Sequence, residues 1–68
     1  MEKVEISTEF IKLDQFLKWT GLCDTGAEAK MEILEGKVKV NGVTETQRGK
    51  KLRKGDTIEH QGKIFVIE

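Results

Sequence analysis

The sequence predicts an α+β domain, in which two helices pack on a small, mostly antiparallel sheet of four or five strands. Three observations predict this class. The first half holds two segments whose apolar residues recur three and four positions apart, as on one helical face. The second half alternates apolar and polar residues, as strands do. Glycines separate these segments, and a chain of 68 residues suffices for a single domain over residues 1–68.

A short strand and a helix are expected first. The Val-Glu-Ile run at residues 4–6 alternates in the manner of a strand. Leu13, Phe16 and Leu17 then share one helical face, which predicts a helix near residues 12–20. A glycine follows this range directly, as is usual where a left-handed residue ends a helix.

A capping signal predicts where the second helix begins. Thr25 and Glu28 have the spacing of a capping box, in which the threonine oxygen accepts from the Glu28 amide and the glutamate bonds back. The helix is therefore expected near residues 25–35, before a glycine that ends it. The residues expected on its apolar side are Ala29 and Ile33, with Met31 and Leu34 as further candidates.

The remaining chain has the features of β structure. Residues 37–40 alternate strictly, so two valines should face inward and two lysines outward. Asn41 and Gly42 predict a tight hairpin, because both residues tolerate positive φ. Residues 46–51 are polar, basic and glycine-containing, so we expect a mobile loop there. The further strands are expected at residues 43–44, 57–60 and 64–67.

The expected core is a single apolar cluster without covalent or metal support. One cysteine cannot form an intrachain disulfide, and one cysteine with one histidine cannot supply the four ligands of a structural zinc site. We therefore expect no cofactor and no metal. Trp19 is expected to pack rather than to stack on a base. The expected core residues are Val4, Ile6, Leu13, Phe16, Leu17, Ala29, Ile33, Val38, Val40, Leu52, Ile58, Phe65 and Ile67.

The charges are unevenly distributed along a chain of zero net charge. Residues 37–54 hold seven lysines and arginines against one acid, a local charge of +6, whereas the preceding 36 residues sum to −4 and the last 14 to −2. Cationic side chains bind nucleic acids by neutralising phosphates and releasing counterions. A one-signed segment in an otherwise acidic chain therefore favours a polyanion as partner.

Several segments, taken together and in order, resemble the S4 RNA-binding domain family. They are residues 12–17 (KLDQFL), 21–22 (GL), 25–30 (TGAEAK), 36–42 (GKVKVNG) and 55–58 (GDTI). The match spans roughly residues 10–60, and residues 47–52 are similar to the basic loop of a stand-alone bacterial subfamily. This resemblance implies the alpha-L motif of that family as the fold.

The resemblance also implies a non-catalytic module that binds structured RNA, with ribosomal RNA or the ribosome as a candidate target. The family usually opens its second helix with Ser-Arg, whereas this chain has Thr25-Gly26, which keeps the cap and loses the arginine. The helix amides could still receive a phosphate there. We expect the binding residues to share one side of the domain; they are Lys12, Thr25, Gly26, Lys30, Lys37, Lys39, Asn41, Arg48, Lys50 and Lys51.

Two other function classes stay open. A protein-interaction module or ribosome-associated factor could use the acidic helical half. An enzyme would need Cys23 and His60, which are far apart in sequence, and Glu32 is expected on a solvated helix surface. We expect a small, partly buried thiol instead. The chain has no membrane-spanning stretch, so we expect a soluble protein without a membrane partner. A single unpaired cysteine fits a reducing compartment, which favours the cytoplasm. We also expect a monomer. Its preference between RNA and DNA is open.

Overall fold

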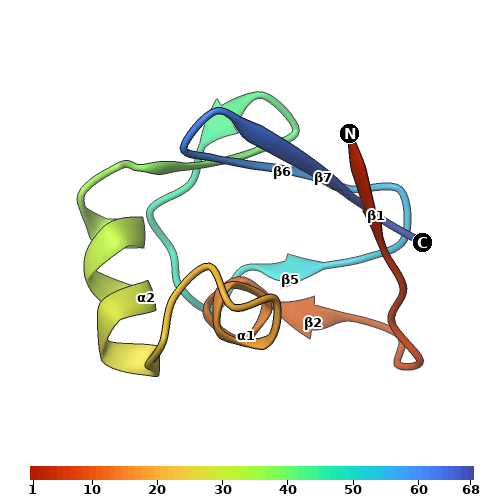
Figure 1. Cartoon of the computed structure of the whole chain (residues 1–68), viewed down its shortest axis with the longest axis horizontal. Helices are drawn as coiled ribbons and strands as arrows, with labels where there is room; N and C mark the ends of the chain where they lie inside the picture. Colours follow the sequence, from red (N-terminus) through yellow and green to blue (C-terminus); the bar gives the residue numbers. More distant parts are fainter.

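The computed structural model describes all 68 residues and contains nine elements. In chain order they are β1 (Glu2–Val4), β2 (Ile11–Lys12), α1 (Leu13–Trp19), α2 (Gly26–Leu34), β3 (Val38–Val40), β4 (Val43–Thr44), β5 (Lys51–Leu52), β6 (Thr57–His60) and β7 (Lys63–Ile67). They form two layers (Figure 1). One layer is a five-stranded sheet in the order β1-β7-β6-β3-β4, and the other holds both helices and the two-stranded sheet β2–β5. No helix has the length and apolar character needed to span a membrane.

The α+β class and both helices are confirmed. Helix α2 begins as the capping signal predicts, with the Thr25 hydroxyl accepting from the Glu28 amide at 3.1 Å. The reciprocal bond differs by one residue, because the Glu28 carboxylate accepts from the amide of Asp24, at 3.3 Å, rather than from that of Thr25. The carboxylate thus ties down the chain just ahead of the cap.

The sheet is mostly antiparallel, as expected, with one parallel pair at its edge. Strand β1 runs parallel to β7, and the pairs β7–β6, β6–β3 and β3–β4 are antiparallel. The first strand lies at Glu2–Val4, two residues before the expected 4–6. The expected loop at 46–51 ends at Lys51, which already belongs to β5. Strands of two residues, such as β2 and β5, are too short to show alternation in a sequence.

The core forms between the two layers, and it is the expected one with two changes. Val4 is half-buried and packs against the cluster instead of lying within it, and Cys23 joins the cluster at 1% exposure. Phe16 of α1 meets Phe65 of β7 edge to face, with ring centroids 5.9 Å apart. This aromatic contact connects the helical layer to the centre of the sheet.

Three apolar side chains on the helices are solvent-exposed: one that was expected to pack, and two that were candidates for the apolar side of α2. Trp19 is 59% exposed, so the expectation that it packs is wrong. It is the last residue of α1, and it extends beyond the buried face formed by Leu13, Phe16 and Leu17. On α2, Ala29 and Ile33 are buried one turn apart. The residues placed on the outer side of that helix are Met31 and Leu34.

Candidate functional site

The basic loop is fixed against the start of α1 by main-chain hydrogen bonds. The amide of Leu13 donates to the carbonyl of Lys50 at 2.9 Å, and the amide of Asp14 donates to the carbonyl of Arg48 at 3.0 Å. These are helix N-terminal donors, which have no partner inside the helix. Lys12 caps α1 without a side-chain bond, so the loop takes over part of the capping role. The expected mobile loop is therefore anchored.

Four cations are brought together by this arrangement. Strands β2 and β5 place Lys12 directly opposite Lys51, and the bonded carbonyls place Arg48 and Lys50 at the same end of α1. All four side chains are exposed. We call this set, Lys12, Arg48, Lys50 and Lys51, the basic cluster. The α1 amides of Leu13 and Asp14 are already used by carbonyls, so the cluster would have to bind an anion through its side chains.

Phe10 organises cations beside the cluster, a role that the sequence does not indicate. Lys51 Nζ lies 4.8 Å from the Phe10 ring centroid, and the guanidinium carbon of Arg53 lies 5.8 Å from it. Both positions suit cation–π attraction, which holds a cation while leaving it partly open to solvent. Arg53 is thereby added to the candidate surface. Its only signal in the sequence is membership of the basic segment.

Of the two lysines of the β3 region, Lys39 lies apart from the basic cluster and Lys37 forms an ion pair. Val38 and Val40 are buried, so Lys39 between them projects from the opposite face of the sheet, across from Glu59. The basic cluster lies in the helical layer, on the other side of that sheet. Lys37 Nζ pairs with the Glu35 carboxylate at 3.2 Å. The single shared side expected for all the lysines does not extend to Lys39, because strand alternation turns it outward.

The start of α2 offers little to a phosphate. Thr25 uses its hydroxyl as the helix cap, and the Glu28 amide is the donor to it. Gly26 is exposed, with no atom within 4 Å of the position a Cβ would take. Asp24 and Glu28 place negative charge at this end, which opposes an anion. Lys30 is exposed on the helix and forms no ion pair.

Asn41 has a structural role. Its side-chain oxygen accepts from the Thr57 amide at 3.0 Å, and its side-chain nitrogen donates to Asp56 at 3.1 Å. Its φ of 53° and the following positive φ of Gly42 form the expected hairpin turn. Asn41 thus connects the β3–β4 turn to the start of β6. Both polar atoms of its side-chain amide already form hydrogen bonds within the fold. A ligand could use only the remaining hydrogen-bonding capacity of these two atoms.

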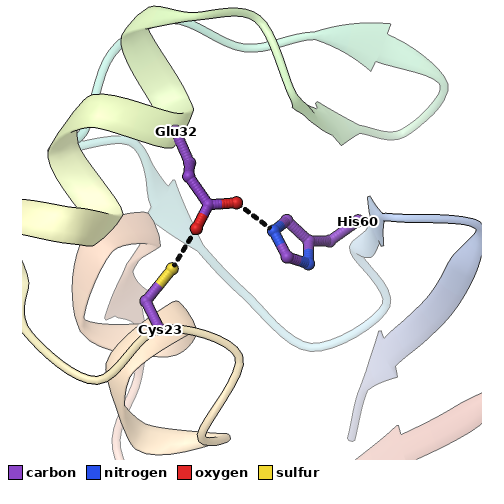
Figure 2. A group of neighbouring side chains, drawn as sticks. All are labelled: Cys23, Glu32 and His60. Atoms are coloured by element: carbon purple, nitrogen blue, oxygen red, sulfur yellow. Dashed lines mark hydrogen bonds and ion pairs between the residues drawn. The ribbon is translucent and has the colours of Figure 1, made fainter.

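A polar cluster beneath α2 is absent from the sequence expectations. The Glu32 carboxylate, whose side chain is only 12% exposed, lies between Cys23 and His60 (Figure 2). Cys23 Sγ donates to Oε2 at 3.1 Å, and His60 Nε2 lies 2.6 Å from Oε1. Cys23 and His60 are each 1% exposed. The expectation that Glu32 faces solvent is therefore wrong, because β6 presents a polar partner under this turn of α2.

The hydrogen bonds within this cluster fix its charge states. Burial, together with the hydrogen bond to the Glu32 carboxylate, raises the pKa of the Cys23 thiol to about 12. The pKa of Glu32 is lowered, first by the hydrogen bond from His60 and then by that from Cys23. At neutral pH, Glu32 is therefore an ionised carboxylate that accepts two hydrogen bonds, and the thiol is a poor nucleophile. The other ring nitrogen, His60 Nδ1, is buried without a partner.

Comparisons with known proteins agree with this architecture. Residues 4–68 match the S4 domain family. RlbA of Bacillus subtilis (strain 168), named a probable ribosome maturation protein, is 41% identical over 59 residues, which are 87% of this chain and 83% of RlbA. YbcJ of Escherichia coli (strain K12) is 40% identical over 52 residues, which are 76% of this chain and 74% of YbcJ.

A solved structure resembles the whole fold. The solution structure of YbcJ from E. coli has a TM-score of 0.73 and 32% identity, and the match covers 98% of this chain and 86% of YbcJ. That structure is described as revealing an alpha-L motif involved in RNA binding. The fold expected from the sequence, two helices on a small sheet with the alpha-L arrangement, is confirmed.

Proposed function

The chain belongs to the S4 domain family, and we propose that it is a non-catalytic module that binds structured RNA through the basic cluster. The observation that carries the proposal is the fixed position of Lys12, Arg48, Lys50 and Lys51 at the start of α1. YbcJ, whose alpha-L motif is described as involved in RNA binding, supports the same class of ligand.

The geometry supports recognition of the RNA backbone. Main-chain bonds order the loop before any ligand arrives, so binding pays less conformational entropy than it would for a free loop. Cations bind phosphates whatever the base sequence, whereas base reading in RNA depends mainly on stacking aromatics. The candidate surface holds one half-buried aromatic, Phe10, which already contacts Lys51. We therefore expect shape and charge to dominate over base sequence.

Ribosomal RNA is the target we propose first. The name of RlbA connects a relative of similar length to ribosome maturation. The proposal includes a cytoplasmic location, where such RNA is assembled. It does not depend on catalysis, and the high pKa of the Cys23 thiol, about 12, argues against a nucleophilic role for that residue. Glu32 faces the interior and so is not available to a protein partner on the acidic face.

Two triple variants of equal charge change test the proposal. The first replaces Arg48, Lys50 and Lys51 by glutamine, and the second replaces Lys3, Lys18 and Lys63, which lie on other elements. Binding to fluorescent fragments of bacterial ribosomal RNA is measured at several salt concentrations, with duplex DNA of equal length as a second ligand. Each lost phosphate contact should lower the salt slope by about 0.7–0.9, so the slope of the first variant should fall by about 2–3.

The two variants separate a local site from a general charge effect. The second variant should retain most of the wild-type slope and affinity for ribosomal RNA. The proposal is wrong if both variants, folded by circular dichroism, bind that RNA equally well. Tighter binding to DNA than to RNA would also contradict it. A protein partner that is still pulled down after nuclease treatment, and that binds the first variant as well as wild type, would support protein binding instead.

A further inference from the structure

Three side chains of the types that bind transition metals converge between the two layers. Cys23 comes from the connection between α1 and α2, Glu32 from α2 and His60 from β6 (Figure 2). One ligand atom from each lies within 4.8 Å of the other two. They form a thiol, carboxylate and imidazole set, in which each donor type is an established ligand of Zn²⁺.

We propose that Cys23, Glu32 and His60 bind one thiophilic divalent cation of the Zn²⁺ type, with water as the fourth ligand. Three protein ligands plus water is the usual arrangement of an open tetrahedral zinc site. The site differs from the structural zinc site with four Cys/His ligands that the sequence excludes, because one of its three protein ligands is a carboxylate. The proposal is independent of RNA binding.

The distances suit such an ion if the two hydrogen-bonded pairs separate slightly and the widest pair closes slightly. Zinc lies about 2.0–2.3 Å from nitrogen, oxygen and sulfur ligands, so neighbouring ligand atoms around it are about 3.3–3.8 Å apart. The Sγ–Oε2 distance is 3.1 Å and the Nε2–Oε1 distance is 2.6 Å. The widest separation in the set is within 4.8 Å, so the atoms need to move by about 1 Å.

The protons can be balanced without disrupting the surroundings. The ion takes the place of the thiol proton, which leaves to solvent, and of the Nε2 proton, which moves to Nδ1 of the same ring. His60 Nδ1 is buried without a partner, so that exchange converts an unpaired acceptor into an unpaired donor and adds no second unpaired group. Thiolate and carboxylate then neutralise the two charges of the cation.

Charge and access also favour a cation. Asp24 and Glu28 lie near enough to act electrostatically on the Cys23 thiol. The Glu32 side chain, 12% exposed, is the part of the cluster that reaches solvent, so water would reach a bound ion from that side. An ion held there would link the α1–α2 connection, α2 and β6, and would stabilise the fold by an amount that grows with the logarithm of its concentration over Kd.

Cobalt provides a direct spectroscopic test on the full chain, after removal of metals by a chelator. Wild type should take up one Co²⁺ with tetrahedral d–d bands and a sulfur-to-cobalt charge-transfer band, and Zn²⁺ should displace it. Cys23→Ser should abolish the charge-transfer band, and Glu32→Gln should weaken Co²⁺ binding by at least about tenfold. Glu35→Gln, which removes an exposed carboxylate one turn along, should bind as wild type does.

Several results would overturn the proposal. One is a wild-type chain that shows no charge-transfer band with Co²⁺; another is Cys23→Ser or Glu32→Gln binding Co²⁺ with unchanged affinity. Circular dichroism checks that each variant is folded. If Cys23→Ser unfolds, Glu32→Gln and the band of the wild-type chain still decide the matter. A melting temperature that rises with Zn²⁺ in wild type, and not in Glu32→Gln, would be a second supporting result.

Discussion

Replacing Glu32 by alanine should destabilise the protein far more than the same change at Glu35. Glu32 accepts from His60 Nε2 at 2.6 Å and from the Cys23 thiol at 3.1 Å. Removing it strands a buried imidazole N–H, which costs about 1–3 kcal/mol, while the thiol, a weak donor, adds little. Because His60 Nδ1 is already unpaired, neither ring nitrogen would then have a partner. We expect a loss of about 2 kcal/mol.

That loss is large for a chain of this length. A domain of 68 residues is expected to have a free energy of unfolding of about 3–10 kcal/mol. At a denaturant slope near 1 kcal/mol/M, 2 kcal/mol shifts the urea midpoint by about 2 M. Glu35→Ala removes only an exposed ion pair with Lys37, worth about 0–1 kcal/mol.

Urea unfolding at pH 7, followed by far-ultraviolet circular dichroism in the presence of a chelator, measures both variants without bound metal. The reasoning is refuted if the midpoints of Glu32→Ala and Glu35→Ala agree within about 0.3 M. A double variant, Glu32→Leu with His60→Leu, provides a further check. It should lose less stability than Glu32→Ala, because only the weak thiol donor of Cys23 is then left unpaired.

Three further changes test other contacts. The lowered pKa of Glu32 gives stability that is present above its unfolded value, about 4.3, and lost as pH falls through the folded value. Glu32→Gln should therefore flatten the loss of urea midpoint on acidification, and an unchanged profile would contradict this. Asn41→Ala should lower the free energy of unfolding by about 1 kcal/mol, since the amide of Thr57 loses its acceptor; a shift below the error of urea titration would disprove that role. Thr25→Ala should lose about 1 kcal/mol by uncapping α2 at Glu28, and Thr25→Ser should not. Equal midpoints for the two Thr25 variants would exclude the capping explanation.

Local patterns predicted the fold well because they report local physics. The spacing of Leu13, Phe16 and Leu17 follows from the period of a helix, and the Asn41-Gly42 turn follows from the tolerance of both residues for positive φ. Membership of the apolar core followed from the same patterns, apart from Val4 and Cys23. Trp19 was misjudged because large apolar residues are usually buried, and only the end of the helix exposes this one.

The polar cluster could not be predicted, because it depends on pairing between distant elements. The turn at Gln61 and Gly62, both with positive φ, sets the register of β6 on β7 and turns His60 inward with Ile58. A shift of one residue would bury Glu59 and expose His60. The basic cluster was predicted only in part, for the same reason. The sequence identified its charges, but it could not show which carbonyls anchor the loop to α1.

Because the basic loop is attached to α1, a change in the length of the loop should also change the stability of the helix. Helix α1 has seven residues, and a helix so short is marginal without outside support. Two of its first amides depend on carbonyls of Arg48 and Lys50, and a third, that of Gln15, donates to the Asp14 carboxylate. An insertion or deletion between β4 and β5 would therefore alter the core through Phe16 and Leu17. Length variation, normally tolerated in surface loops, should be restricted at this loop, and diversity should appear in its side chains instead.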